Sequence, residues 1–314
     1  MFILSSSCIN YMNLNSPLST LSSVHHSKER NIFMREIPVQ LLSDTVRALY
    51  LTANYQIGKD IESAVEEAEK KEASPIGKSV LCQLCENYKI AREESVAICQ
   101  DTGMAILFMD IGQEVHFTGG DFEEAVQDGV RRAYRDGYLR KSIVNDPVFE
   151  RKNTGDNTPA VLHLRIVPGD KVHILAVAKG FGSENMSAVK MCTPSEGEAG
   201  IRDFIIDTAR KAGPNPCPPM IIGVGVGGSF ETAALMAKRM TARPVGTHNP
   251  DPRYAKLERD ALEAINRLGI GPAGIGGTTT ALAVNIDYAP THIASMPVAV
   301  NICCHAARHA DGLI

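Results

Sequence analysis

Apolar residues recur every three or four positions from Arg35 to about Arg92. This spacing is typical of helices that bury one face. It predicts three helices, which contain the segments VQLLSDTVRALYLTANY, DIESAVEEAEKKE and SPIGKSVLCQLCENYKIAREE. Farther along, FEEAVQDGVRRAYRDGYLRKSIV predicts a fourth amphipathic helix that ends near Gly137.

Short apolar runs between turn residues predict strands in the second part of the chain. The runs AVLHLRIV and KVHILAVA flank Pro168, Gly169 and Asp170, which predicts a hairpin. A helix, a strand and a helix are then expected in IRDFIIDTARKAG, PMIIGVGVGG and ETAALMAKRM, followed by a helix in AKLERDALEAINRLG. Because hairpin and crossover signals both occur, the predicted fold class is α/β, with mixed sheets flanked by helices.

The composition narrows the class of protein further. The chain has 314 residues, 44% of them hydrophobic and 22% charged, with a formal net charge of −4. Charges of both signs are dispersed, so no basic face indicates a nucleic-acid partner. No apolar run reaches the roughly 18 residues that a membrane span needs, so we expect a soluble protein. Eight cysteines in a chain of this length favour a reducing compartment, and we expect the cytoplasm.

Residues 1–33 differ from the rest of the chain. They are rich in Ser and Asn, contain no acidic residue before Glu29 and no basic residue before Lys28, and lack a long apolar core. This composition is poor for a secretory signal. We expect a disordered N-terminal extension, or sequence upstream of a start at Met34, followed by one domain over residues 34–314.

The stretch VAICQDTGMAIL places residues that strands disfavour between two apolar runs. Cys99 lies in this stretch, Cys217 lies in NPCPP, and Cys303 and Cys304 lie in NICCHAAR. All are at expected strand ends or Pro-containing bends, from which side chains can point into a shared cavity. Spacing alone leaves open whether each is a metal ligand, a nucleophile or a buried thiol.

The other cysteines carry weaker signals. Cys82 and Cys85 are three residues apart on one face of a predicted helix, and no second pair with metal-ligand spacing accompanies them, so we expect them to pack. Cys192 is not distinguished by its spacing.

Among the histidines, His292 precedes the cysteine-bearing strand and is a candidate for an active-site role, with a plain loop position as the alternative. His163 and His173 alternate with apolar residues and are expected on strand faces. His305 and His309 are four residues apart, a spacing that can bind metal on a helix, but it is also ordinary for a polar C-terminal helix.

The sequence GVGVGG fits the dinucleotide-binding pattern G-x-G-x-x-G at Gly223, Gly225 and Gly228. A Pro-rich loop follows where a second parallel strand ending in an acidic residue would be needed. A tight turn between a strand and a helix is therefore favoured. An oxyanion or carboxylate bound at the helix N-terminus is an intermediate alternative, and a nicotinamide-dependent oxidoreductase is a remote one.

Several motifs together resemble the α subunit of the iron–sulfur class of fumarate hydratase, the class I hydro-lyases that include tartrate dehydratase. They are CQDTGMA, GYLRKS, NTGDNTPA, KGFGSENMSA, NPCPP with IIGVGVGG, NRLGIGP, and PVAVN before the final cysteines. The resemblance covers residues 34–314 and implies an iron–sulfur hydro-lyase α-subunit fold over that range.

The resemblance implies roles for single residues. Cys99, Cys217 and Cys304 match the positions that hold a [4Fe–4S] cluster, whereas Cys303 and Cys192 do not. The implied catalytic residues are Asp101 and His292, and the implied substrate-binding residues are Gln100, Arg140 and Gly182. A dicarboxylate needs about two cationic partners, for which Arg308 and Lys179 are further candidates beside Arg140.

The implied reaction is the reversible hydration of fumarate to L-malate, with an open iron position as Lewis acid. NTGDNTPA and GSENMSA resemble the fumarate chains more than the tartrate chains, and an L-tartrate dehydratase α subunit is the alternative. A non-catalytic iron–sulfur scaffold, with a fourth ligand such as Cys303 or His305, is remote. The resemblance also implies a separate β subunit, in an α2β2 assembly, which supplies the rest of the site.

Overall fold

The computed structural model describes residues 34–314, so the extension expected over residues 1–33 lies outside the described residues. The three predicted N-terminal helices are confirmed as α1 (Val39–Tyr55), α2 (Lys59–Lys71) and α3 (Pro75–Glu94). The start of α3 is capped by Ser74, whose hydroxyl accepts a hydrogen bond from the Gly77 N–H. The helix ends at Ser95, which adopts a left-handed conformation with φ of 54°.

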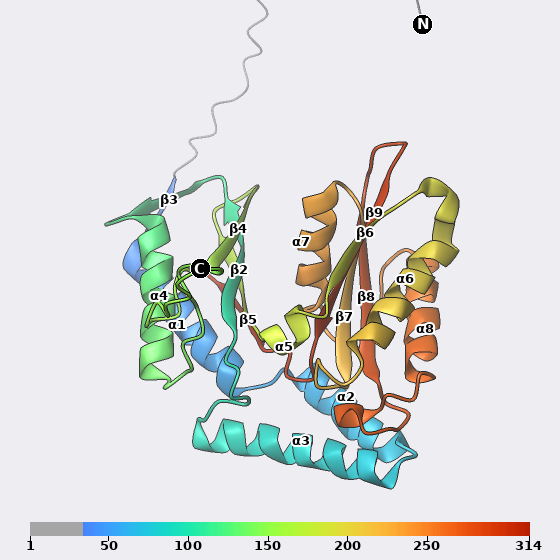
Figure 1. Cartoon of the computed structure of the whole chain (residues 1–314). Coiled ribbons are helices and arrows are strands. Elements are labelled where there is room, and N and C mark those ends of the chain that lie inside the picture. The colour runs from blue at the N-terminus through green and yellow to red at the C-terminus, as the bar shows by residue number, and fades with distance from the viewer. Residues whose placement is uncertain (1–33) are drawn as a thin grey trace, which may run out of the picture. The chain divides into compact units, whose positions relative to one another are not determined.

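The first large sheet has the strand order β10-β5-β2-β4. Figure 1 labels its strands β2, β4 and β5. Its strands are β2 (Met104–Gly112), β4 (Val161–Val167), β5 (Val172–Lys179) and β10 (His309–Leu313). Alternate residues of β2, such as Leu107 and Met109, pack into a core with α1 and with α4 (Phe122–Asp136), the fourth predicted helix. A small parallel pair, β1 (Arg35–Pro38) and β3 (Val115–Thr118), lies outside this sheet.

The predicted hairpin between β4 and β5 is wrong, although both strands and the tight turn between them are present. Strand β2 lies between the two, parallel to β4 and antiparallel to β5. The burial pattern explains the insertion, because nearly every residue of β2 is buried while β4 exposes Val161, Leu164 and Ile166 as an edge strand does. The turn residues determine that the chain reverses direction after β4. Which strands pair with each other also depends on which strand is most apolar.

The second large sheet has the order β6-β9-β7-β8 (Figure 1). Its strands are β6 (Ala188–Cys192), β7 (Met220–Gly227), β8 (Ala281–Ala289) and β9 (Met296–Cys303). Helices α6 (Gly197–Ala212) and α8 (Pro252–Asn266) cover one face, and α7 (Phe230–Met240) covers the other. The expected helices at these positions are confirmed, and so is the α/β class with mixed sheets.

The glycines of GVGVGG allow α7 to lie directly on β7. A Cβ at Gly223 would stand 2.0 Å from the Ala237 carbonyl oxygen, and one at Gly225 would stand 2.1 Å from that of Ala233. These two glycines therefore serve close packing of a helix on a strand. This packing accounts for two of the three glycines of the motif without a bound nucleotide.

The expected polar helix around His305 and His309 is wrong. The chain leaves β9 in an irregular segment and His309 begins β10, which pairs antiparallel with β5. Sheet pairing with a distant strand overrides the local helical pattern here. Among residues 34–314, no helix is both long and apolar enough to cross a membrane.

Strand directions bring four strand ends to one place. Met104 at the start of β2 is opposite Lys179 at the end of β5, and Ile221 near the start of β7 is opposite Cys303 at the end of β9. The short helix α5 (Phe181–Glu184) follows β5 at this junction (Figure 1). Two 3₁₀ turns, η1 (Pro194–Glu196) and η2 (Pro272–Gly274), complete the fold.

Candidate active site

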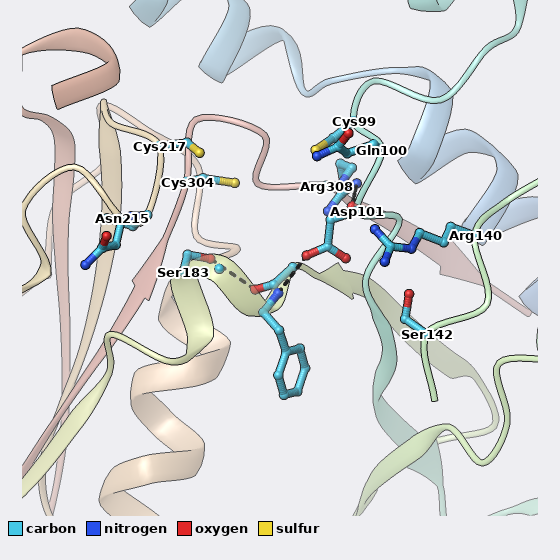
Figure 2. Close-up of a pocket in the computed structure, with 14 residues that line it drawn as sticks. Cys99, Gln100, Asp101, Arg140, Ser142, Ser183, Asn215, Cys217, Cys304 and Arg308 are labelled. Carbon is cyan, nitrogen blue, oxygen red and sulfur yellow. Dashed lines mark hydrogen bonds between the residues drawn. The ribbon is translucent and has the colours of Figure 1, made fainter. Parts of the chain in front are cut away.

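A cavity of about 420 Å³ lies where these strand ends meet. Cys99 reaches it from the loop between α3 and β2, Cys217 from the turn before β7, and Cys304 from the end of β9. Figure 2 shows the sulfur atoms of Cys217 and Cys304 pointing into the space between them and the Cys99 loop. Three cysteines that are far apart in the sequence thus line one cavity.

Seven of the eight site residues expected from the sequence line this cavity. They are Cys99, Gln100, Asp101, Arg140, Gly182, Cys217 and Cys304. The eighth, His292, is exposed in the loop before β9, whereas Cys304 directly follows that strand. Eight residues of strand at roughly 3.3 Å each separate the two, so His292 does not reach the cavity of its own chain. Its expected catalytic role stays a prediction.

Of the paired cysteines, only Cys304 lines the cavity. Both pack against a core cluster with α2 and α3, but Cys303 is buried within that cluster and is 4% exposed, whereas Cys304 lies at its edge. Cys192 lies in another core cluster. Cys85 packs against the cluster that contains Cys303, and burial raises its pKa to about 11, whereas Cys82 is exposed, so the expectation that Cys82 packs is wrong. The geometry therefore favours Cys304 over its neighbours as a ligand.

Asp101 holds the two sides of the cavity together. One carboxylate oxygen accepts a hydrogen bond from the Gly103 N–H at 3.0 Å, and the other accepts one from the Phe181 N–H, at the start of α5, at 2.9 Å (Figure 2). Each oxygen can accept a further hydrogen bond, since a carboxylate offers about four acceptor sites. Asp101 therefore positions α5 and still presents acceptors to a ligand.

Two arginines provide positive charge in the cavity. Arg308 is 1% exposed, and its guanidinium donates to the backbone carbonyl of Asp101 while its Nε has no partner. Arg140 is exposed, and its backbone carbonyl accepts a hydrogen bond from the Thr102 hydroxyl. In the part of the chain that the structure describes, neither guanidinium forms an ion pair with a carboxylate. A buried cation without an anionic partner is costly, so this cavity is suited to an anion.

Lys179, the other cationic candidate, is already engaged. It is fully buried, and its Nζ donates to the Ser183 hydroxyl at 2.8 Å and lies 3.3 Å from a Glu184 carboxylate oxygen. It does not line the cavity itself, although Ser183 does. Lys179 therefore orients α5 instead of offering its charge to a ligand.

The thiols fit an iron–sulfur cluster better than a single metal ion. Burial, with the nearby Cys304 and Cys99 thiols, raises the pKa of Cys217. Within residues 34–314, no three His, Cys, Asp or Glu side chains come close enough together to hold one ion. In a cluster each thiolate binds a different iron, so its ligands are spread around a cavity as these three are.

The two side chains considered as a fourth ligand, His305 and Cys303, are engaged elsewhere. The Nδ1 atom of His305 lies 2.8 Å from the Tyr88 hydroxyl, and burial lowers the pKa of this histidine to about 4. Cys303 faces the core. Neither side chain lines the cavity, which argues against a closed, non-catalytic cluster.

Three polar residues of the cavity wall are absent from the sequence predictions, namely Ser142, Ser183 and Asn215. Each is within two residues of a predicted site residue, in GYLRKS, KGFGSENMSA and NPCPP respectively. The Ser142 N–H donates to the Asn157 side chain at 2.7 Å, which fixes the loop that carries Arg140. Their position next to predicted residues is the signal that could have identified them.

The chain is similar to known proteins over most of its length. A family model described as fumarate hydratase (Fumerase) matches residues 43–312. The chain is 41% identical to a protein of Methanocaldococcus jannaschii named "Putative L(+)-tartrate dehydratase subunit alpha", over 86% of this chain and 96% of that protein. It is 30% identical to the L(+)-tartrate dehydratase subunit alpha of Escherichia coli strain K12, over 88% of this chain and 91% of that protein.

Proposed function

Because the chain belongs to the fumarate hydratase (Fumerase) family of hydro-lyases, we propose that it is the cluster-bearing α subunit of a fumarate hydratase, which interconverts fumarate and L-malate. The observation that carries this proposal is one cavity that combines three thiols with two arginines free of carboxylate partners among the described residues. Thiolates suit an iron–sulfur cluster, and the arginines suit a dicarboxylate.

We assign Cys99, Cys217 and Cys304 as the ligands of a [4Fe–4S] cluster. When bound by three thiolates, such a cluster supplies an iron with an open position, which acts as a Lewis acid toward the hydroxyl group that leaves as water. We leave Cys303 and His305 out of the proposed ligand set, since neither lines the cavity. The cysteines of the described residues are all free, which supports a reducing compartment such as the cytoplasm.

The chain's own side chains bind and orient the substrate. Arg140 and Arg308 each offer a planar pair of N–H donors to a carboxylate. Gln100 and the backbone at Gly182 line the same cavity, and we propose that both contact the substrate. Asp101 is the group of this cavity that we assign to proton transfer, since its carboxylate oxygens keep free acceptor sites beside the ligand.

A second candidate substrate is L(+)-tartrate, because the relatives described above are named L(+)-tartrate dehydratases. The two substrates share both carboxylates and differ by one hydroxyl group, and a few polar contacts decide such a choice. The experiment is to measure kcat/KM for L-malate, fumarate and L(+)-tartrate on the anaerobically purified complex. A higher value for L-malate than for L(+)-tartrate supports the proposal, and the reverse assigns the chain to tartrate.

The proposed partner is a separate β subunit in an α2β2 assembly. The named relatives are α subunits, and this chain covers more than nine-tenths of each. Gln100 and Arg140 are exposed at the cavity, so a second chain can complete the site there. We expect the α chain alone to bind the cluster and to turn over slowly or not at all, and addition of β to restore turnover.

A further inference from the structure

Residues 269–280, which we call the glycine loop, contain the motif GIGPAGIGGTTT and pack against the turn that carries Cys217. The Ala273 N–H donates to the Pro218 carbonyl at 2.9 Å. On the other side of the cysteine, a Cβ at Gly274 would stand 2.2 Å from the Pro214 side chain. The loop thus contacts the chain on both sides of Cys217.

The Cys217 turn needs this support. Cys217 has a φ of 51°, in the left-handed region that residues with a side chain rarely adopt. Its N–H donates to the Pro214 carbonyl at 3.1 Å, which closes the turn. Such backbone persists where the surrounding structure determines it, and the surroundings here are the glycine loop.

A single carboxylate holds the far end of the glycine loop. Glu72, at the junction of α2 and α3, is 8% exposed. One of its oxygens accepts N–H groups of Ser74 at 2.9 Å and Thr278 at 2.8 Å, and the other accepts that of Thr279 at 2.8 Å. A Cβ at Gly277 would stand 2.8 Å from the carboxylate, so the loop backbone approaches Glu72 closely.

We infer that Glu72 is a positioning residue for the Cys217 thiol, acting through the glycine loop. Glu72 does not line the cavity, and its hydrogen bonds go to Ser74, Thr278 and Thr279 and not to the cysteine. Its carboxylate fixes Thr278 and Thr279, and the loop then holds Pro214 and Pro218 on either side of the left-handed Cys217. That the position of the Cys217 thiol helps to bind a cluster rests on the proposed function. The position itself does not depend on a cluster, because contacts within the chain determine it.

The test compares the alkylation rates of individual cysteines in the full-length, metal-free, reduced chain, with each site quantified by mass spectrometry. In Glu72→Gln we expect the rate at Cys217 to change by about tenfold, because the unfavourable left-handed turn relaxes when its support is lost. The rates at Cys99 and Cys304 should stay within a factor of about two. Glu67→Gln is the matched control, since Glu67 is an exposed carboxylate of α2 that pairs with Lys71.

A second variant perturbs the Cys217 turn while Glu72 stays unchanged. Gly274→Ala places a methyl group against Pro214, whereas Gly269→Ala adds one at a similar φ, +70° against +75°, with nothing within 4 Å. Only Gly274→Ala should change the alkylation rate at Cys217. Because both variants place alanine at a similar positive φ, comparing them separates the effect of the contact with Pro214 from that of backbone strain. After anaerobic reconstitution, both Glu72→Gln and Gly274→Ala should hold less iron than their controls.

Unchanged Cys217 rates in Glu72→Gln and Gly274→Ala would overturn the inference, and so would equal changes at all three cysteines, which indicate general loosening. If the parent chain itself takes up no iron, the proposed function fails. The alkylation rates still decide the positioning role in that case, because they need no cluster.

Discussion

Replacing Glu72 with Gln should remove a pH-dependent part of the stability of this chain. Burial opposes ionisation of the carboxyl group, but hydrogen bonds from the backbone N–H groups of Ser74 and Thr278 outweigh it and lower the pKa of Glu72 from 4.5 to about 2. A carboxyl group with a lowered pKa in the folded state stabilises it above the unfolded pKa, and this stabilisation is lost as pH falls toward the folded pKa.

The magnitude follows from the two pKa values. A shift from 4.5 to about 2 corresponds to about 3 kcal/mol in the free energy of unfolding. Linkage gives a loss of about 1 kcal/mol between pH 7 and pH 4, and of about 2 kcal/mol by pH 3. The glutamine side chain of the variant carries no charge, so the variant should lack this portion of the pH dependence and be about 3 kcal/mol less stable near pH 7.

The assay is urea unfolding of the metal-free chain at pH 7, 4 and 3, followed by circular dichroism. Subtracting the free energy of unfolding of Glu72→Gln from that of the parent removes the contribution of all other carboxyl groups. This difference in free energy should become smaller as the pH falls. Glu67→Gln, at an exposed site, should leave the free energy of unfolding and its pH dependence close to those of the parent. Parallel pH dependences for the parent and Glu72→Gln would show that Glu72 does not carry this part of the stability.

Three further substitutions test other parts of the account. Gly225→Ala should lower the free energy of unfolding by about 1–3 kcal/mol, because its methyl group would meet the Ala233 carbonyl, and an unchanged melting temperature would contradict this. Arg140→Lys should raise KM for L-malate by about tenfold or more without loss of iron, because lysine cannot form paired hydrogen bonds with a carboxylate. Steady-state kinetics together with an iron assay will show whether substrate binding is weakened while the cluster is retained. Cys303→Ser should retain iron whereas Cys304→Ser should lose it, and the opposite result in an iron assay would move the ligand to Cys303.

The sequence could predict the parts of the fold that depend on local pattern. The helices α1 to α4 follow from apolar spacing, and the strand at β7 follows from an apolar run between turn residues. Pairing was not predictable in the same way. The turn after β4 indicates a hairpin, but the burial of β2 places that strand between β4 and β5. His309 likewise joins a sheet because β5 is available to pair with it.

The site was predictable only where resemblance supplied the residues. Spacing could not show that Cys99, Cys217 and Cys304 line one cavity, because this depends on the ends of β2, β7 and β9 lying together. Ser183 and Asn215 were missed since a single polar residue in a loop carries no periodic signal. The preference for fumarate over tartrate, drawn from two motifs, is not reinforced by the relatives, whose names specify L(+)-tartrate.

The most direct test of the central claim is one measurement on the α chain purified anaerobically with its β subunit: iron and sulfide content together with the rate of fumarate formation from L-malate. We predict about four irons and four sulfides per α chain in the parent. Cys99→Ser, Cys217→Ser and Cys304→Ser should each lose both the cluster and the activity. A colourless, iron-free complex with full activity would contradict the account.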